Sequence, residues 1–135
     1  MGAEGATALD WDEDVVHVGG DVTRDWRVPV RFLDFAAVTP REVAPGYLGR
    51  YVHSDQITQG RVDIAPGAVI PEHSHPHEQW TLLLSGALEL TVSGTPHVLQ
   101  PGQILYIAPH ERHSARAIAA SVVLDVFHPP RDDYR

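Results

Sequence analysis

Cysteine is absent from this chain of 135 residues, so no disulfide framework exists, and basic residues are few. Ten Lys and Arg stand against eighteen Asp and Glu, and the net charge of −8 argues against a nucleic acid or an anionic membrane as partner. Long apolar runs are also missing, since stretches such as 82–84 and 122–124 fall far below the roughly 20 residues of a membrane span. The first thirty residues show no basic stretch followed by an apolar one, so we expect a cytoplasmic protein.

Turn-forming residues divide the chain into short apolar runs. The chain contains eleven Gly and eleven Pro, and turn residues recur at intervals of roughly ten residues from Val28 onward. Leu88, Leu90 and Val92 alternate with less apolar residues, which is the period-two pattern of a half-buried strand. No long helical period is present. The pattern predicts one all-β domain, a sandwich or barrel over 21–135, preceded by a flexible acidic segment over 1–20.

The stretch 67–86 has the spacing of a metal site. Side chains two residues apart on a strand point to the same side, so His73 and His75 can share one ion. Gln79 can reach that ion after a short turn at Pro76. If this turn shifts by one residue, Glu78 becomes the oxygen ligand in place of Gln79.

A fourth ligand has to come from elsewhere in the chain. His113 is the candidate, because it follows a second turn and the apolar strand expected over 104–107. Three imidazoles and a neutral amide leave a divalent ion its full charge, which favours an anionic substrate oxygen. Mn, Fe, Ni, Co and Zn all fit such a set of nitrogen and oxygen ligands.

The pattern G-x5-H-x-H-x3-(E/Q)-x6-G, followed by a turn, a strand and a single histidine, resembles the two motifs of the cupin superfamily. The resemblance extends from about 62 to 127 and implies a jelly-roll β-barrel that holds one divalent transition metal ion. In the second motif, Ala108 and His110 stand where the family carries Pro and Gly. The matching positions are Gly67, His73, His75, Gln79 and Gly86 in the first motif and His113 in the second.

The segment VVLDVFHPPR near the carboxyl end contains a second pattern, D-x-F-x3-R, formed by Asp125, Phe127 and Arg131. It resembles the active-site strand of the KdgF-type monocupins. The resemblance implies that these residues line the metal pocket of an enzyme that opens 4,5-unsaturated uronates to linear keto acids. Their chemistry suits that role: Arg131 pairs with an anionic group, Asp125 moves a proton and Phe127 forms an apolar wall. The alternative is that Asp125 lies on a solvated face and the opposite face, 122, 124 and 126, forms the core.

Other functions remain open because one fold of this kind hosts several chemistries. A metal-dependent oxygenase or lyase acting on a small metabolite is one alternative, and a non-catalytic module that binds a sugar or anion is the other. The strands expected over 80–84 and 104–107 are apolar on both faces, so a second subunit or the amino-terminal arm has to cover the outer face. We expect a homodimer, with Trp80 and Tyr106 serving in packing.

Overall fold

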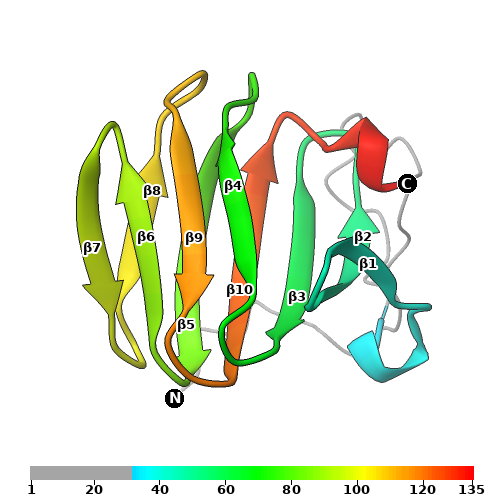
Figure 1. Cartoon of the computed structure of the whole chain (residues 1–135). Coiled ribbons are helices and arrows are strands. Elements are labelled where there is room, and N and C mark those ends of the chain that lie inside the picture. The colour runs from blue at the N-terminus through cyan, green and yellow to red at the C-terminus, as the bar shows by residue number, and fades with distance from the viewer. Residues whose placement is uncertain (1–31) are drawn as a thin grey trace, which may run out of the picture.

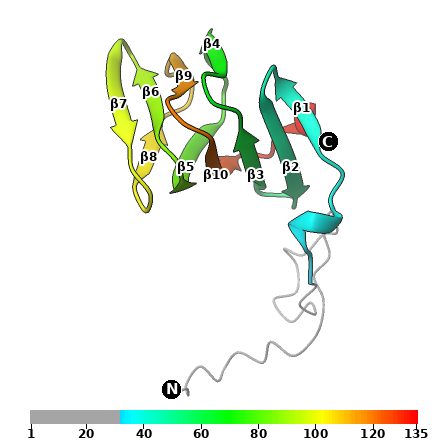
Figure 2. The same cartoon turned by 60° about the horizontal axis from the view of Figure 1, so that its bottom comes forward.

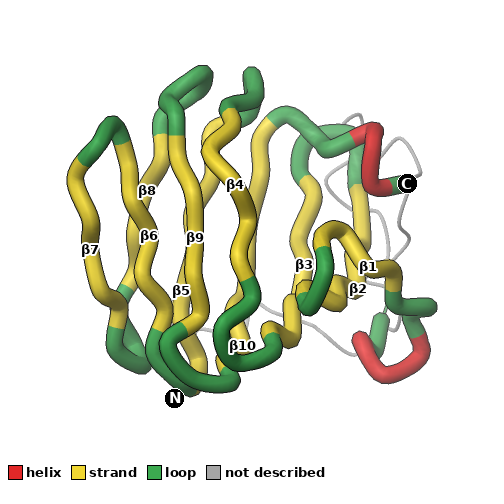
Figure 3. Tube along the Cα trace, viewed as in Figure 1, coloured by secondary structure: helices red, strands yellow, loops and turns green. Residues whose placement is uncertain are grey.

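The computed structural model describes residues 32–135. The predicted flexible segment 1–20, and the first part of the predicted domain, 21–31, lie outside the described residues. Strands make up most of the described chain, and its helices are two short 3₁₀ turns, η1 (Phe35–Ala37) and η2 (Asp132–Tyr134) (Figure 3). The strands are β1 (Arg41–Ala44), β2 (Tyr47–His53), β3 (Thr58–Ile64), β4 (Val69–His73), β5 (Glu78–Ser85), β6 (Leu88–Val92), β7 (Thr95–Leu99), β8 (Ile104–Ile107), β9 (His113–Ala117) and β10 (Ser121–His128).

The strands form two antiparallel sheets that face each other (Figures 1 and 2). One sheet has the order β1-β2-β3-β10-β5-β8 and the other has the order β4-β9-β6-β7. Neighbours far apart in sequence, such as β3 and β10 or β4 and β9, pair directly. The all-β jelly roll predicted from the sequence is therefore confirmed.

Alternating burial along the strands builds the interior between the sheets. Leu83 and Ile107 are fully buried, whereas Leu84 and Ile104 on the same strands are 43% and 57% exposed. The predicted alternation of Leu88, Leu90 and Val92 is also present on β6, because these three side chains are buried. The interior face of β10 carries Ser121, Val123, Asp125 and Phe127.

Gly86 shows why one motif glycine is needed at the turn between β5 and β6. Its φ is +96°, a backbone conformation that residues with a side chain rarely adopt. A Cβ atom there would also overlap the Ala120 carbonyl oxygen and the Ser121 side chain. The close approach of this turn to the start of β10 therefore depends on glycine.

The outer face of the six-stranded sheet is apolar near its β8 edge. The rings of Trp80 and Tyr106 contact each other with centroids 4.7 Å apart and are 46% and 42% exposed. Both residues thus pack together on the outer surface and take no part in the interior. Among residues 32–135, no helix has the length and apolar character needed to cross a membrane.

Candidate metal centre

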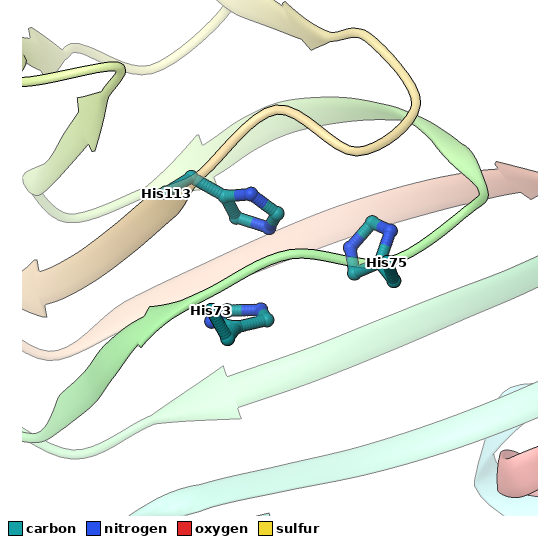
Figure 4. Close-up of side chains that lie close together, drawn as sticks. All are labelled: His73, His75 and His113. Carbon is teal, nitrogen blue, oxygen red and sulfur yellow. The ribbon is translucent and has the colours of Figure 1, made fainter.

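Three histidines converge at one end of the space between the sheets (Figure 4). His73 is the last residue of β4 and pairs in register with His113, the first residue of β9, so that their ring centroids lie 4.3 Å apart. His75 reaches the same place from the loop after β4, and its ring centroid is 4.8 Å from that of His113. One ring nitrogen of each histidine lies within 4.8 Å of the others, so the cluster could hold a metal ion.

The expectation that His73 and His75 share one strand is wrong. The strand ends at His73, and the chain then turns through residues 74–77 before β5 begins. The two rings nevertheless lie close together, because the loop brings the ring centroid of His75 to 5.7 Å from that of His73 (Figure 4).

Main-chain carbonyl groups set the tautomer of all three imidazoles. The Nδ1 atoms of His73, His75 and His113 lie 2.9, 3.0 and 2.7 Å from the carbonyl oxygens of residues 71, 77 and 111. A carbonyl oxygen can only accept, so each Nδ1 carries the proton and each Nε2 keeps a free lone pair. This is the tautomer that a metal-binding histidine requires.

Gln79, on β5, lies beside this cluster with 9% of its surface exposed. Its amide nitrogen donates to the Thr81 hydroxyl at 2.9 Å, so its Oε1 atom faces His75 Nε2 at 3.1 Å. Two acceptors therefore face each other, an arrangement that a cation between them would stabilise. The alternative ligand, Glu78, points elsewhere, since its carboxylate accepts a hydrogen bond from Tyr106 at 3.2 Å on the outer side.

His113 supplies a second sign that a ligand atom belongs at this place. Its Nε2 atom is buried and has no hydrogen-bond partner, which is a costly state for a polar atom. Burial lowers the pKa of His113, and burial followed by the charge of Arg131 lowers the pKa of His75 to about 4. Both imidazoles are therefore neutral at neutral pH, and the donor set fits a divalent transition metal.

Asp125 lies deeper between the sheets and faces the interior. It is 8% exposed, so the alternative that placed it on a solvated face is wrong. Its carboxylate accepts a 2.6 Å hydrogen bond from the Thr81 hydroxyl. The same hydroxyl accepts the hydrogen bond from the Gln79 amide, so the two bonds form one chain. Burial raises the pKa of Asp125 to about 6, against the opposing effects of Thr81 and Arg131.

Arg131 and Phe127 form one wall of the cavity. The guanidinium of Arg131 lies 4.8 Å from the ring of Phe127 and 4.0 Å from the ring of Tyr134, and the residue is 7% exposed. Two hydrogen bonds of 3.0 and 2.9 Å, from Nε and from one terminal nitrogen, join it to Asp133. A positively charged group is thereby held rigidly at the cavity that His73 and His113 also line.

Three further residues line the cavity and were missed from the sequence: Thr81, Tyr51 and Tyr134. Asp133, which holds Arg131, was missed as well. Thr81 had an available signal, because it shares strand parity with Gln79 within an otherwise apolar strand. The second motif departs from the family at His110, which adopts the left-handed φ of +67° that the family's glycine would provide. Its amide donates to the His75 carbonyl at 2.7 Å and so ties this turn to the loop that carries His75.

Comparisons with known proteins agree with this geometry. The KdgF structure from Halomonas sp. is 31% identical, has a TM-score of 0.72 and covers 77% of this chain and 97% of its own. An RmlC-like cupin from Shewanella frigidimarina, 22% identical with a TM-score of 0.73, covers 77% of this chain and 95% of its own and shares the fold.

Curated relatives match shorter stretches. Protein SchB from Streptomyces halstedii is 36% identical over 75 residues, which are 52% of this chain and 54% of SchB. The transcriptional activator RhaS from Mannheimia succiniciproducens is 36% identical over 50 residues, 37% of this chain and 19% of RhaS. The matches thus span about half of SchB and about a fifth of RhaS. The family model of the cupin domain matches residues 60–127, and the chain therefore belongs to the cupin family as a single-domain cupin that resembles KdgF.

Proposed function

We propose that this protein is a metal-dependent isomerase that opens the ring of a 4,5-unsaturated uronate to the linear keto acid. The observation that carries the proposal is the placement of Asp125 and Arg131 in the cavity lined by His73 and His113, two members of the three-histidine cluster. A buried carboxyl group with a pKa near 6 is a suitable general base at neutral pH. The likeness to KdgF, over nearly all of that protein, supports the same assignment.

His73, His75, His113 and Gln79 would hold the metal, which can be Mn, Fe, Ni, Co or Zn. When bound, the ion would act as a Lewis acid on a substrate oxygen. The neutral Gln79 amide would leave the ion its full positive charge, which suits an anionic substrate. Arg131 supports this choice of substrate, since its buried guanidinium can pair with a carboxylate.

The reaction needs one proton to move from oxygen to carbon. In our proposal, Asp125 takes the proton of the anomeric hydroxyl group, the bond between the anomeric carbon and the ring oxygen breaks, and the anomeric carbon becomes an aldehyde. The electron pair of the broken bond stays on the ring oxygen, which becomes an enolate. Asp125 or a water molecule then gives a proton to the double-bond carbon that does not carry the enolate oxygen. The carbon that carries this oxygen thereby becomes the keto group. General acid and base catalysis of this kind contributes about 10² to 10⁴-fold.

The test is the conversion of an unsaturated galacturonate by metal-loaded protein, followed by the loss of its ultraviolet absorbance and by NMR of the product. We expect equal conversion with and without oxygen, because an isomerase consumes none. Conversion that requires oxygen would replace the proposal by the oxygenase alternative. Binding of the uronate without any product would replace it by the non-catalytic module.

The Asp125→Asn variant tests the assigned base within the same assay. The amide cannot take the hydroxyl proton, so turnover should be lost while the metal content stays that of the wild type. Unchanged turnover would remove Asp125 from the mechanism.

The predicted homodimer stays a prediction. Its basis is the exposed apolar face around Trp80 and Tyr106, which a second subunit would cover. Light scattering of the purified protein measures the mass directly, and a monomer would contradict the prediction.

A further inference from the structure

Tyr51 lies on the interior face of the six-stranded sheet in an unusual position. Across the strands it is in register with Gly60 on β3, and Gly60 is in register with Asp125 on β10. The ring lies flat on the sheet, since a Cβ atom at Gly60 would overlap it and a Cβ atom at Gly49 would lie 2.6 Å from its hydroxyl oxygen. Two glycines on neighbouring strands thus make the space in which this ring lies.

The other face of the same ring is also covered. The ring of Tyr134, from η2, lies 4.5 Å away with an interplanar angle of 34°. Tyr134 in turn lies against the guanidinium of Arg131. Tyr51 is therefore held between the main chain of the sheet and the stacked side chains of the carboxyl end, which fixes the position of its hydroxyl group.

No hydrogen bond joins the Tyr51 hydroxyl to another group of residues 32–135, although the residue is only 9% exposed. The nearby Tyr47 differs, because its hydroxyl donates to the Ala68 carbonyl oxygen at 3.2 Å. Both tyrosines line the cavity that Asp125 and Arg131 also line. A hydroxyl group that borders a cavity and makes no bond within the protein is available to a ligand in that cavity.

We propose that Tyr51 is a substrate-contacting residue that donates a hydrogen bond to an oxygen of the bound sugar acid and so orients it against Asp125. This inference rests on the proposed function, which places a hydroxylated acid in the cavity. Burial and the charge of Asp125 raise the pKa of Tyr51, so the hydroxyl group keeps its proton and remains a donor. With Arg131 on the carboxylate, the hydroxyl of Tyr51 is left for another oxygen of the same molecule.

The test compares Tyr51→Phe with Tyr47→Phe, because each change removes one oxygen atom from a tyrosine of the same cavity. The probe is galacturonate, a saturated sugar acid, titrated calorimetrically into the metal-loaded wild type and both variants. We expect Tyr51→Phe to weaken binding roughly three- to tenfold and Tyr47→Phe to stay within about twofold of the wild type. Metal content and the thermal unfolding midpoint should not change in Tyr51→Phe.

Equal affinity in all three proteins would overturn the role of Tyr51, and so would equal losses in both variants or no binding by the wild type. The kinetics of unsaturated galacturonate provide a separate readout, in which Tyr51→Phe should raise KM more than it lowers kcat. A wild type that binds galacturonate and leaves the unsaturated uronate unchanged would refute the proposed reaction only. The ratio of the galacturonate binding constants of the wild type and Tyr51→Phe would still test whether Tyr51 contacts the sugar acid.

Discussion

Thr81 and Asp125 lie directly opposite each other on β5 and β10, and the Thr81 hydroxyl donates a 2.6 Å hydrogen bond to the Asp125 carboxylate. Thr81 has one proton to give, and it accepts its second bond from the amide of Gln79. The direction of donation therefore runs from Gln79 through Thr81 to Asp125. This chain joins the candidate metal ligand to the candidate base.

Replacing Thr81 by Val should destabilise the protein and alter its pH dependence. The variant leaves the Gln79 amide without an acceptor and Asp125 without a donor, which costs about 2 kcal/mol. Because Thr81 lowers the pKa of Asp125, the pKa should rise further and the acidic limb of the activity profile should move to higher pH. Urea unfolding and a pH–rate profile measure both effects, with Thr91→Val on β6 as the control.

Replacing Gln79 by Glu should separate metal affinity from catalysis. The added charge should bind a divalent ion more tightly, as titration with a fluorescent metal competitor would show. A carboxylate at this position also competes for the single proton of Thr81 and repels the charge on Asp125, which raises the pKa of Asp125. We expect lower turnover at neutral pH despite full metal loading. Full turnover in this variant would contradict the assigned hydrogen-bond chain.

The Asp125→Asn variant should stabilise the metal-free protein at high pH. The pKa of Asp125 is raised from 3.8 to about 6, so the folded state holds its proton more tightly than the unfolded chain does. Stability should therefore fall as the pH rises through this interval, by about 3 kcal/mol in all. Asn avoids that loss, so the gain should be present at about pH 8 and absent at about pH 4. An equal gain in stability at both pH values would show that the gain does not come from the raised pKa of Asp125.

Removing one imidazole should abolish metal binding. His113→Ala loses the buried nitrogen that has no protein partner, so we expect its metal content to fall from one ion per chain to near none. In the wild type, an ion at one hundred times its Kd should stabilise the fold by about 2.7 kcal/mol, and the variant should show no such shift. His97→Ala, on the exposed strand β7, is the control and should behave as the wild type. Full metal content in His113→Ala would place the ion elsewhere.

Much of the fold could be predicted, because alternate residues of a strand point to opposite faces and this pattern is visible in a short stretch of sequence. Alternation on β6 and the turn residues at Gly86 indicate an all-β domain without knowledge of the pairing. The facing of Asp125 was ambiguous, since both faces of β10 are largely apolar. Its burial is decided by the second sheet, β4-β9-β6-β7, which faces the side of β10 that carries Asp125.

The site could be predicted only in part. The spacing of His73 and His75 indicated a metal cluster, although His75 lies in a loop and not on the strand. The pairing of His73 with His113 depends on the register of β4 and β9, which are far apart in sequence. Tyr51 was missed for a similar reason, because part of the space for its ring is created by Gly60 on the neighbouring strand.

The carbonyl groups that hold the three imidazoles each lie only two residues from the histidine concerned. The orientation of the three imidazoles is thus set within short segments of main chain, whereas that of Gln79 depends on the Thr81 hydroxyl. A change at Tyr51 can accordingly alter which molecule is accepted while the hydrogen bonds of the metal ligands are kept. Substitutions in that part of the cavity could therefore change the substrate specificity while the metal site stays intact.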